Sequence, residues 1–184
     1  MLGNDYTGQN CSIARTLELV GERWTMLVLR DVFLGRRRFD AIQRDLGVAR
    51  NVLAARLDRL VAADILRKVP YQERPPRHEY RLTEKGLDLW PAIVELLRWG
   101  DRYAAPPAGP PIVLRHRDCG GLLDEWRICE NCGKPLGPRD VRAEPGPGAN
   151  AEQSTPRQAP PPSAEGDGPA ERSAASRVST SAPG

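Results

Sequence analysis

The stretch from Arg38 to Leu60, RFDAIQRDLGVARNVLAARLDRL, constrains the fold more than any other part of the chain. Its first half places Phe39, Ile42 and Leu46 on one helical face and then stops at Gly47. Its second half repeats leucine at helical spacing. The stretch therefore predicts a helix, a tight turn and a second helix.

The other face of the second predicted helix carries small and polar residues. Asn51 and Ala55 share this face, with Arg50 and Ala54 beside them. A helix-turn-helix places the first residues of its second helix against base edges in the major groove, where small side chains allow a close approach. Because any two amphipathic helices look partly like this, the pair alone leaves DNA binding and ordinary helix packing both open.

The flanking chain predicts a helical domain with one hairpin. Residues 12–34 read as two core helices joined near Gly21, and a further helix capped by Thr83 is expected to reach Tyr103. The segments 65–71 and 78–82 predict a β-hairpin around a tip rich in Pro and Arg. The expected fold class is α+β and mostly helical.

Basic residues cluster at two places where DNA phosphates could lie. Residues 1–104 hold 18 Lys and Arg against 14 Asp and Glu, whereas residues 105–184 hold 9 against 10. A hairpin that follows a helix-turn-helix is a wing, and the basic residues there and before the helix pair are candidates for backbone contacts. The candidates for phosphates are Arg36, Arg37, Arg59, Arg74 and Arg77, and those for base edges are Arg50, Asn51, Ala54 and Ala55.

Several spaced motifs appear in a recognisable order. They are Cys11, GERWT (21–25), RRRF (36–39), LAARLDRL (53–60), YQERPPRHEYRLTEKG (71–86) and Trp99. With them, residues 11–103 resemble the HxlR-type winged-helix transcription regulators, a MarR-like group. The resemblance implies a homodimer joined through the first and last helices of the domain, bound to a palindromic operator as repressor or activator. One departure is Ala62-Ala63-Asp64, where such proteins frequently have Gly.

Cys11 lies just before the first predicted helix. The positive end of a helix dipole favours the thiolate form, and Arg15 follows one turn later. In several proteins that this chain resembles, a Cys at this place senses oxidants or electrophiles. The alternatives are a redox sensor and a small buried apolar side chain.

A second set of cysteines lies beyond the winged-helix region. His116 and Cys119 form a His-x-x-Cys pair, and Cys129 and Cys132 form a Cys-x-x-Cys pair nine residues later. Two such turns can each give two ligands to one tetrahedral ion, and three thiolates with an imidazole suit Zn²⁺. The alternatives are a redox dithiol at Cys129 and Cys132, or exposed thiols with no role. A ligand set made only of protein side chains leaves no open coordination position, which disfavours zinc catalysis.

These observations divide the chain into four parts. Residues 11–103 form the DNA-binding and dimerisation domain, 104–111 a linker, 112–142 a small zinc-ribbon-like module, and 143–184 a disordered tail rich in Pro, Gly, Ala and Ser. No apolar run is long enough to span a membrane and no signal peptide is recognisable, so the expected location is the cytoplasm.

The leading hypothesis is a sequence-specific, homodimeric transcription regulator that is not an enzyme and responds to an oxidant, a small molecule or nothing. The rival hypothesis is a thiol-disulfide or metal-handling protein that uses the winged helix as a scaffold for protein binding. A third is a ribbon that recruits a protein partner such as the transcription machinery. The chain offers no phosphate-binding Gly-rich loop and no Ser/His/Asp set, which disfavours an enzyme.

Overall fold

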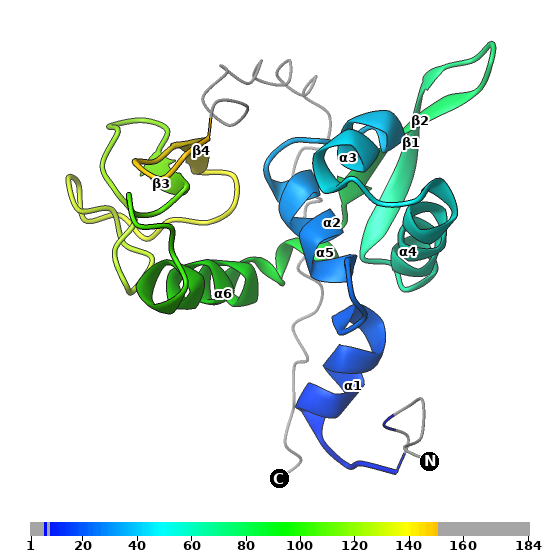
Figure 1. Ribbon diagram of the computed structural model, residues 1–184, viewed down its shortest axis with the longest axis horizontal. Helices are drawn as coiled ribbons and strands as arrows, with labels where there is room; N and C mark the ends of the chain where they lie inside the picture. Colours follow the sequence, from blue (N-terminus) through cyan, green and yellow to red (C-terminus); the bar gives the residue numbers. More distant parts are fainter. Residues whose placement is uncertain (1–5, 7, 151–184) are drawn as a thin grey trace, which may run out of the picture.

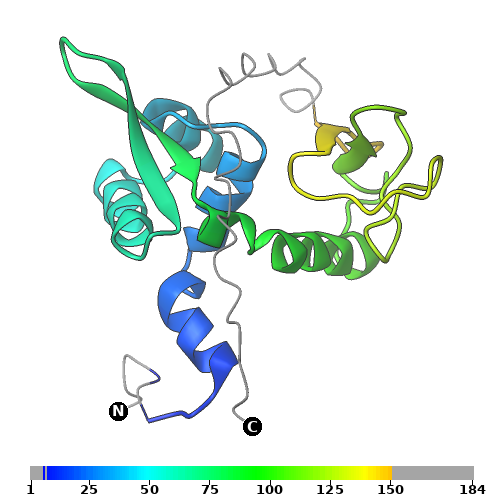
Figure 2. The ribbon, with the colours of Figure 1, turned by 180° about the vertical axis from the view of Figure 1, so that it is seen from behind.

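The computed structural model describes residue 6 and residues 8–150 of the chain (Figure 1). The elements are α1 (Ser12–Val20), α2 (Thr25–Phe33), α3 (Phe39–Leu46), α4 (Arg50–Ala62), β1 (Leu66–Gln72), β2 (Arg77–Leu82), α5 (Glu84–Leu87), α6 (Trp90–Tyr103), β3 (Ile112–His116) and β4 (Val141–Pro145). Figures 1 and 2 place the β1–β2 hairpin and the module around β3 and β4 at opposite ends of the molecule. The predicted α+β fold with a winged helix is confirmed.

The helix-turn-helix consists of α3 and α4. Gly47 ends α3 in the left-handed conformation, with φ of 60°, which glycine adopts without steric cost. In α4 the side chains of Leu53, Leu57 and Leu60 are completely buried in the main core. Each such leucine contributes about 1.5–3 kcal/mol through burial, so the rotation of α4 about its axis is fixed.

The wing is the antiparallel hairpin of β1 and β2, in register from Leu66 opposite Leu82 at its base. Arg38, at the start of α3, attaches the wing to the helices. Its Nε lies 3.3 Å from Glu79 Oε1, and its guanidinium carbon lies 4.4 Å from the centre of the Tyr71 ring. The hairpin therefore leaves the domain at a defined angle.

The turn that enters the wing contains no glycine. Asp64 adopts φ of 54°, a conformation that Asp tolerates better than most residues. Its carbonyl oxygen accepts a hydrogen bond from Thr83 Oγ1 at 2.7 Å. Gly86 is required nearby because a Cβ there would lie 2.2 Å from the carbonyl oxygen of Ile65.

The sequence predicts a helix from Thr83 to about Tyr103 that is weakened or bent by Gly86 and Pro91. The structure goes further and divides it into the two helices α5 and α6. Thr83 does cap α5, because its side chain accepts a hydrogen bond from the backbone N–H of Gly86 at 3.1 Å. Pro91 lies in the first turn of α6. Proline is favourable there because those N–H groups have no partner within the helix.

The expectation that α1 is a core helix is also only partly right. Ala14 and Val20 are buried, but the side chain of Ile13 is 71% exposed and that of Leu17 is 40% exposed. Within one chain, α1 therefore keeps two apolar side chains at the surface.

The small module extends further than predicted. Strand β4 pairs with β3 in register, with Ala143 opposite Leu114. Beyond the strand, Gly146 N–H donates to the Pro111 carbonyl at 2.9 Å. The boundary of a disordered tail at residue 143 is therefore wrong, because backbone pairing with β3 orders this segment despite its Pro and Gly content. Residues 151–184, also predicted to be disordered, lie outside the described residues.

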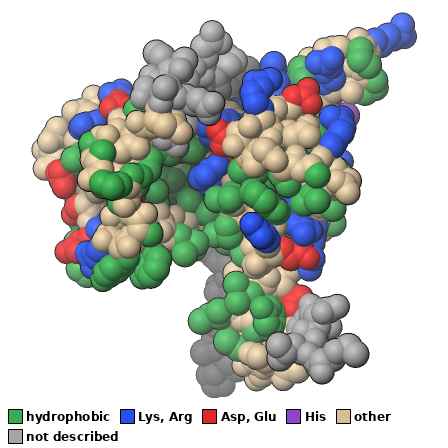
Figure 3. Space-filling model, viewed as in Figure 1, with side chains coloured by type: hydrophobic (Ala, Val, Ile, Leu, Met, Phe, Trp, Pro, Cys, Tyr) green, Lys and Arg blue, Asp and Glu red, His purple; other side chains and the backbone are tan. Residues whose placement is uncertain are grey.

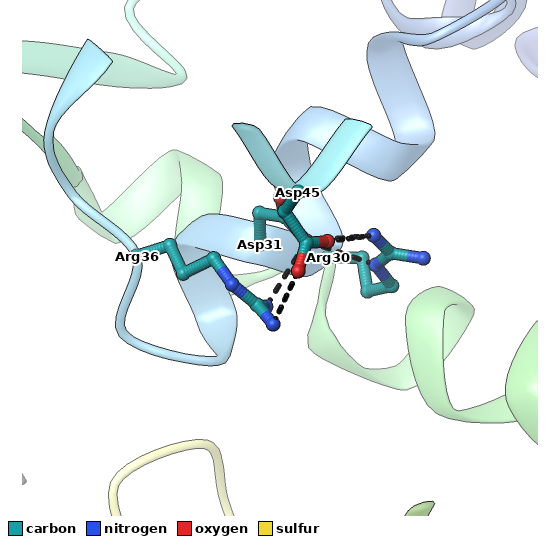
Figure 4. Close-up of polar contacts among 4 residues, drawn as sticks. All are labelled: Arg30, Asp31, Arg36 and Asp45. Carbon is teal, nitrogen blue, oxygen red and sulfur yellow. Dashed lines mark hydrogen bonds and ion pairs between the residues drawn. The ribbon is translucent and has the colours of Figure 1, made fainter. Parts of the chain in front are cut away.

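A cluster of two aspartates and two arginines joins α2 to α3 (Figure 4). Asp31 is completely buried, and its Oδ1 accepts hydrogen bonds from Arg30 Nη2 at 2.8 Å and Arg36 Nη1 at 3.3 Å. Both arginines also pair with Asp45 on α3. Burial raises the pKa of Asp31 to about 6, although the two arginines oppose that rise.

This pKa predicts how stability depends on pH. Between about pH 4 and 6 the folded chain binds a proton at Asp31 that the unfolded chain does not, so the free energy of unfolding should rise as the pH falls. Relative to Asp31→Asn, which cannot titrate, the wild type should gain up to about 3 kcal/mol between pH 7 and 4 in urea denaturation. A difference that is constant with pH, or that falls toward pH 4, would contradict this assignment.

Candidate metal centre and nucleic-acid interface

Four side chains of the small module meet at one point. The ligand atoms of His116, Cys119, Cys129 and Cys132 all lie within 4.8 Å of one another. His116 Nδ1 is 3.2 Å from Cys119 Sγ and 3.4 Å from Cys132 Sγ, and the Sγ atoms of Cys119 and Cys129 are 3.3 Å apart. The two turns predicted from the sequence therefore supply one cluster that can hold a metal ion.

The groups around the cluster favour metal binding. Asp118 Oδ2 lies 3.5 Å from His116 Nε2, so it favours the tautomer that leaves Nδ1 free to bind a metal. Gly121 packs directly against the cluster, because a Cβ there would lie 2.5 Å from Cys129 Sγ. Glycine at this position therefore leaves room for Cys129 Sγ to join the other ligands.

One of the three thiols, that of Cys129, favours the negatively charged thiolate form. Burial opposes ionisation of Cys129, but hydrogen bonds from the backbone N–H groups of Cys132 and Asn131 outweigh it and lower the pKa of Cys129 to about 6. The pKa of Cys119 is raised because, although the backbone of Gly121 favours its thiolate, contacts with the sulfurs of Cys129 and Cys132 disfavour it. A cation bound beside the Cys129 thiolate would favour the thiolate form of the neighbouring cysteines as well.

The separations suit a tetrahedral ion. A Zn–S bond of about 2.3 Å spaces two tetrahedral sulfur ligands by about 3.8 Å. The observed separations, from 3.2 Å to at most 4.8 Å, include that value. All four donors are protein side chains, so the site fits a structural ion better than a catalytic one.

The module packs against α6 through the same cysteine that lies in the cluster. Cys129, Leu136 and Val141 form one buried group with Trp90 and Val94 of α6. Two polar contacts flank this group. The Arg98 guanidinium donates to the carbonyl of Asp124, and Arg127 Nη1 lies 3.2 Å from Glu95 Oε1.

The other candidate site is the outer face of α4. Asn51 and Ala55 are exposed, and Ala54 is half-buried. The Arg50 side chain is 73% exposed and its guanidinium lies over the Phe39 ring, 4.6 Å from the ring centre. Because the leucines of α4 face the core, all four predicted base-reading residues lie on or beside the solvent face at the start of the helix.

The five arginines that were predicted to contact phosphates have different surroundings in the structure. Arg36 is mostly buried and belongs to the cluster with Asp31 and Asp45. Arg59 pairs with Glu22 Oε1 at 2.8 Å and donates to the Glu18 carbonyl, so it holds α4 against α1. Arg37 is half-buried beside β2, where its carbonyl accepts a hydrogen bond from Tyr80 N–H.

The remaining two arginines lie at the end of the wing. Arg74 and Arg77 are exposed, and within residues 8–150 neither forms an ion pair with an acidic side chain. Figure 3 shows basic side chains at the far end of the hairpin, which projects away from the body of the molecule. These two arginines are therefore available to an external anion.

Cys11 immediately precedes α1 and is exposed. Its carbonyl accepts the first hydrogen bond of the helix, from Arg15 N–H at 3.1 Å. The Arg15 guanidinium instead contacts Asn10 Oδ1 at 3.0 Å. The structure thus excludes a buried apolar role for Cys11 within one chain, and oxidant sensing stays a prediction.

Three linking contacts were not predicted. The carboxylate of Glu22 pairs with both Arg56 and Arg59, Arg38 joins α3 to the wing, and Lys68 Nζ pairs with Asp58 Oδ1 at 2.9 Å. The partners are far apart in the sequence, so only the charge of each residue was visible there. The last contact also places the base of the wing beside the outer face of α4.

Residues 19–107 match the family model of the HxlR-like helix-turn-helix. The chain is 53% identical over 140 residues to Mb3122 of Mycobacterium bovis, an uncharacterized HTH-type transcriptional regulator; the match covers 76% of this chain and 89% of that protein. The chain belongs to the HxlR-like helix-turn-helix family.

A solved structure supports the same fold. The crystal structure of PA1607, a candidate transcription factor, is 39% identical with a TM-score of 0.58, and the match covers 72% of this chain and 93% of PA1607. A sequence from Synechocystis, sll1512, also named an uncharacterized HTH-type transcriptional regulator, is 35% identical over 98 residues, covering 53% of this chain and 73% of sll1512. Family and relatives are transcriptional regulators, as the sequence predicted.

The match to Mb3122 extends beyond the winged helix. Only 18 residues precede the part matched by the family model, so an alignment of 140 residues must continue past residue 107 into the small module. The module is therefore shared with that relative.

The helices that the structure describes are all too short or too polar to span a membrane.

Gly121 offers a test of the metal centre. Gly121→Ala should weaken Co²⁺ binding by roughly 10- to 100-fold, the range found when groups that support metal ligands are changed, because the new Cβ displaces Cys129 Sγ. Binding would be followed by thiolate-to-cobalt charge-transfer absorption in the full chain. Gly137→Ala is the matched control, since its Cβ would meet only Asp140 Oδ2 at 3.4 Å. Equal affinities in the two variants would contradict the assigned geometry.

Proposed function

We propose that this protein is a homodimeric, sequence-specific DNA-binding transcription regulator that acts in the cytoplasm. The observation that supports this most strongly is the exposed face at the start of α4. The core fixes α4 so that Asn51 and Ala55 point outward, with Arg50 and Ala54 beside them. Such a surface fits the major groove, where Asn recognises adenine and Arg recognises guanine through paired hydrogen bonds.

In this proposal the wing binds the DNA backbone. Arg74 and Arg77 at its tip are the phosphate contacts, and Arg37 assists from the domain surface. Arg36 and Arg59 act indirectly, because their ion pairs hold α3 and α4 in position. Of the five arginines, two therefore contact phosphates directly, one assists, and two position helices.

The homodimer would form through α1 and α6. On α6, Leu96, Trp99 and Tyr103 are 56%, 63% and 65% exposed, and they follow one another at helical spacing. Ile13 and Leu17 give α1 a similar face. Exposed apolar surface of this extent favours association, and two copies would present paired α4 helices to a palindromic operator. Repression follows where the operator overlaps a promoter.

The metal in this proposal is structural Zn²⁺, held by His116, Cys119, Cys129 and Cys132. Bound zinc supplies a cross-link between the two ligand turns, and ion binding and folding of the module form one equilibrium. Cys11 is the proposed site of an oxidant or small-molecule response, supported by its exposure next to α1. The rival protein-binding scaffold has no support from the names of the relatives.

Base recognition can be tested at Asn51. Asn51→Ala should weaken binding to the operator by about 1–3 kcal/mol and relax the preference at one base pair, while leaving affinity for random DNA unchanged. Fluorescence anisotropy with the DNA upstream of the gene, and with a random duplex, measures both. Equal losses on the two duplexes would contradict a base-reading role.

The wing predicts a different signature. Arg77→Ala should weaken binding to all sequences alike and reduce the slope of log affinity against log salt by about one, because one phosphate contact is lost. Arg59→Ala is the comparison, since this side chain is engaged by Glu22. If Arg59→Ala lowers the salt slope and Arg77→Ala does not, the division between exposed and positioning arginines is wrong.

A further inference from the structure

The metal centre and the dimer helix share one buried side chain. Cys129 is a member of the ligand cluster, and it is also part of the buried group formed with Trp90 and Val94 of α6. Its side chain is 1% exposed. A movement of Cys129 at the metal centre therefore directly alters the packing against α6.

The rest of the contact between the module and α6 consists of a few side chains. Leu136 and Val141 belong to the buried group, Leu114 and Leu123 pack against it, and the polar contacts made by Arg98 and Arg127 lie at its edge. Between β3 and β4 the module consists of turns and single bridges, such as Leu123 with Cys129. A fold with so small a core depends on its cross-link, so loss of the metal would release the module from α6.

Two of the four ligand residues lie at the surface of the module. Cys119 and Cys132 are exposed, whereas Cys129 and His116 are buried. Cys119 Sγ lies 3.3 Å from Cys129 Sγ, close enough for one sulfur to attack the other after oxidation. An oxidant can therefore reach the centre at Cys119, and the neighbouring buried thiolate can complete the reaction.

We propose that the Cys₃His centre is a second oxidation site, at which a hydroperoxide releases zinc, detaches the module from α6 and lowers DNA affinity. This inference rests on the proposed function. The Cys119 thiolate attacks the terminal oxygen of the hydroperoxide, so that an S–O bond forms to give sulfenic acid and the O–O bond breaks with loss of alkoxide, or of hydroxide when the oxidant is hydrogen peroxide. The Cys129 thiolate then displaces hydroxide and forms a disulfide. Two thiolates lose two electrons, the peroxide gains them, and only His116 and Cys132 remain to hold the ion.

The consequence for DNA binding follows from the two faces of α6. One face packs on the module, and the other carries Leu96, Trp99 and Tyr103, which form the proposed dimer surface. When the module detaches, Val94 loses its cover, and α6 is held to the helical domain only near its start, where Trp90 contacts Phe33 of α2 and Ile93 packs on the main core. The second half of α6, which carries the proposed dimer surface, loses its support. Dimer geometry, and with it the spacing of the two α4 helices, is then no longer fixed.

The test uses the zinc-loaded, full-length Cys11→Ser variant, so that the only thiols are those of the centre. Hydrogen peroxide should release one zinc per chain, detected with a chromogenic chelator, with loss of two thiols and a Cys119–Cys129 disulfide in peptide mass spectrometry. Operator affinity should fall on the same time course by a factor in the range of 5- to 150-fold typical of coupled sites. Reductant with zinc should restore it.

A second arm separates the metal from the disulfide. Removal of zinc by a chelator under reducing conditions should lower operator affinity equally, with all three thiols retained. Hydrogen exchange should show lost protection in β3, β4 and α6 but not in α3 and α4.

Three outcomes would overturn the proposal. They are zinc release with unchanged affinity and unchanged exchange in α6, retention of zinc under peroxide, and a Cys129–Cys132 disulfide in place of the expected one. If the reduced, zinc-loaded protein binds no DNA, the proposed function fails, and the exchange data still decide whether the centre controls α6.

Discussion

Burial of one face of α4 is the constraint on which the rest of the structure depends. Leu53, Leu57 and Leu60 are excluded from solvent, so the opposite face of α4 is turned outward. The ion pairs of Glu22 then hold α4 against the first two helices, and the pair of Asp58 with Lys68 places the wing beside it. The surface that we propose contacts DNA is thus a consequence of core packing, which fixes the direction in which the exposed residues point.

Helix α6 has the second organising role because it is apolar on two sides. The face that includes Trp90 and Val94 is covered by the small module, and the face with Trp99 and Tyr103 is exposed. Helix α6 therefore lies between the candidate metal centre and the proposed partner subunit. The protein therefore carries two chemically different thiol sites, Cys11 beside α1 and the Cys₃His centre on α6, each next to one of the helices proposed to form the dimer.

The sequence predicted local features well and long-range pairing poorly. Apolar spacing and Gly47 were enough to predict α3 and α4, and the spacing of two ligand pairs was enough to predict the cluster around Cys129, because both depend on neighbours within a few turns. The sequence could not show that Arg59 is engaged by Glu22, 37 residues away. It also did not reveal that β4 extends past residue 143, since Pro and Gly there are ordered only by pairing with β3.

The central claim is that two copies of the chain place paired α4 helices on a palindromic site. The most direct measurement is a hydroxyl-radical footprint of the purified, reduced and zinc-loaded protein on the DNA upstream of its gene. The account predicts two protected regions related by a dyad and about one helical turn, or a multiple of it, apart, each flanked by weaker protection from a wing. A single protected region without a dyad, or uniform protection that random competitor DNA removes, would contradict it.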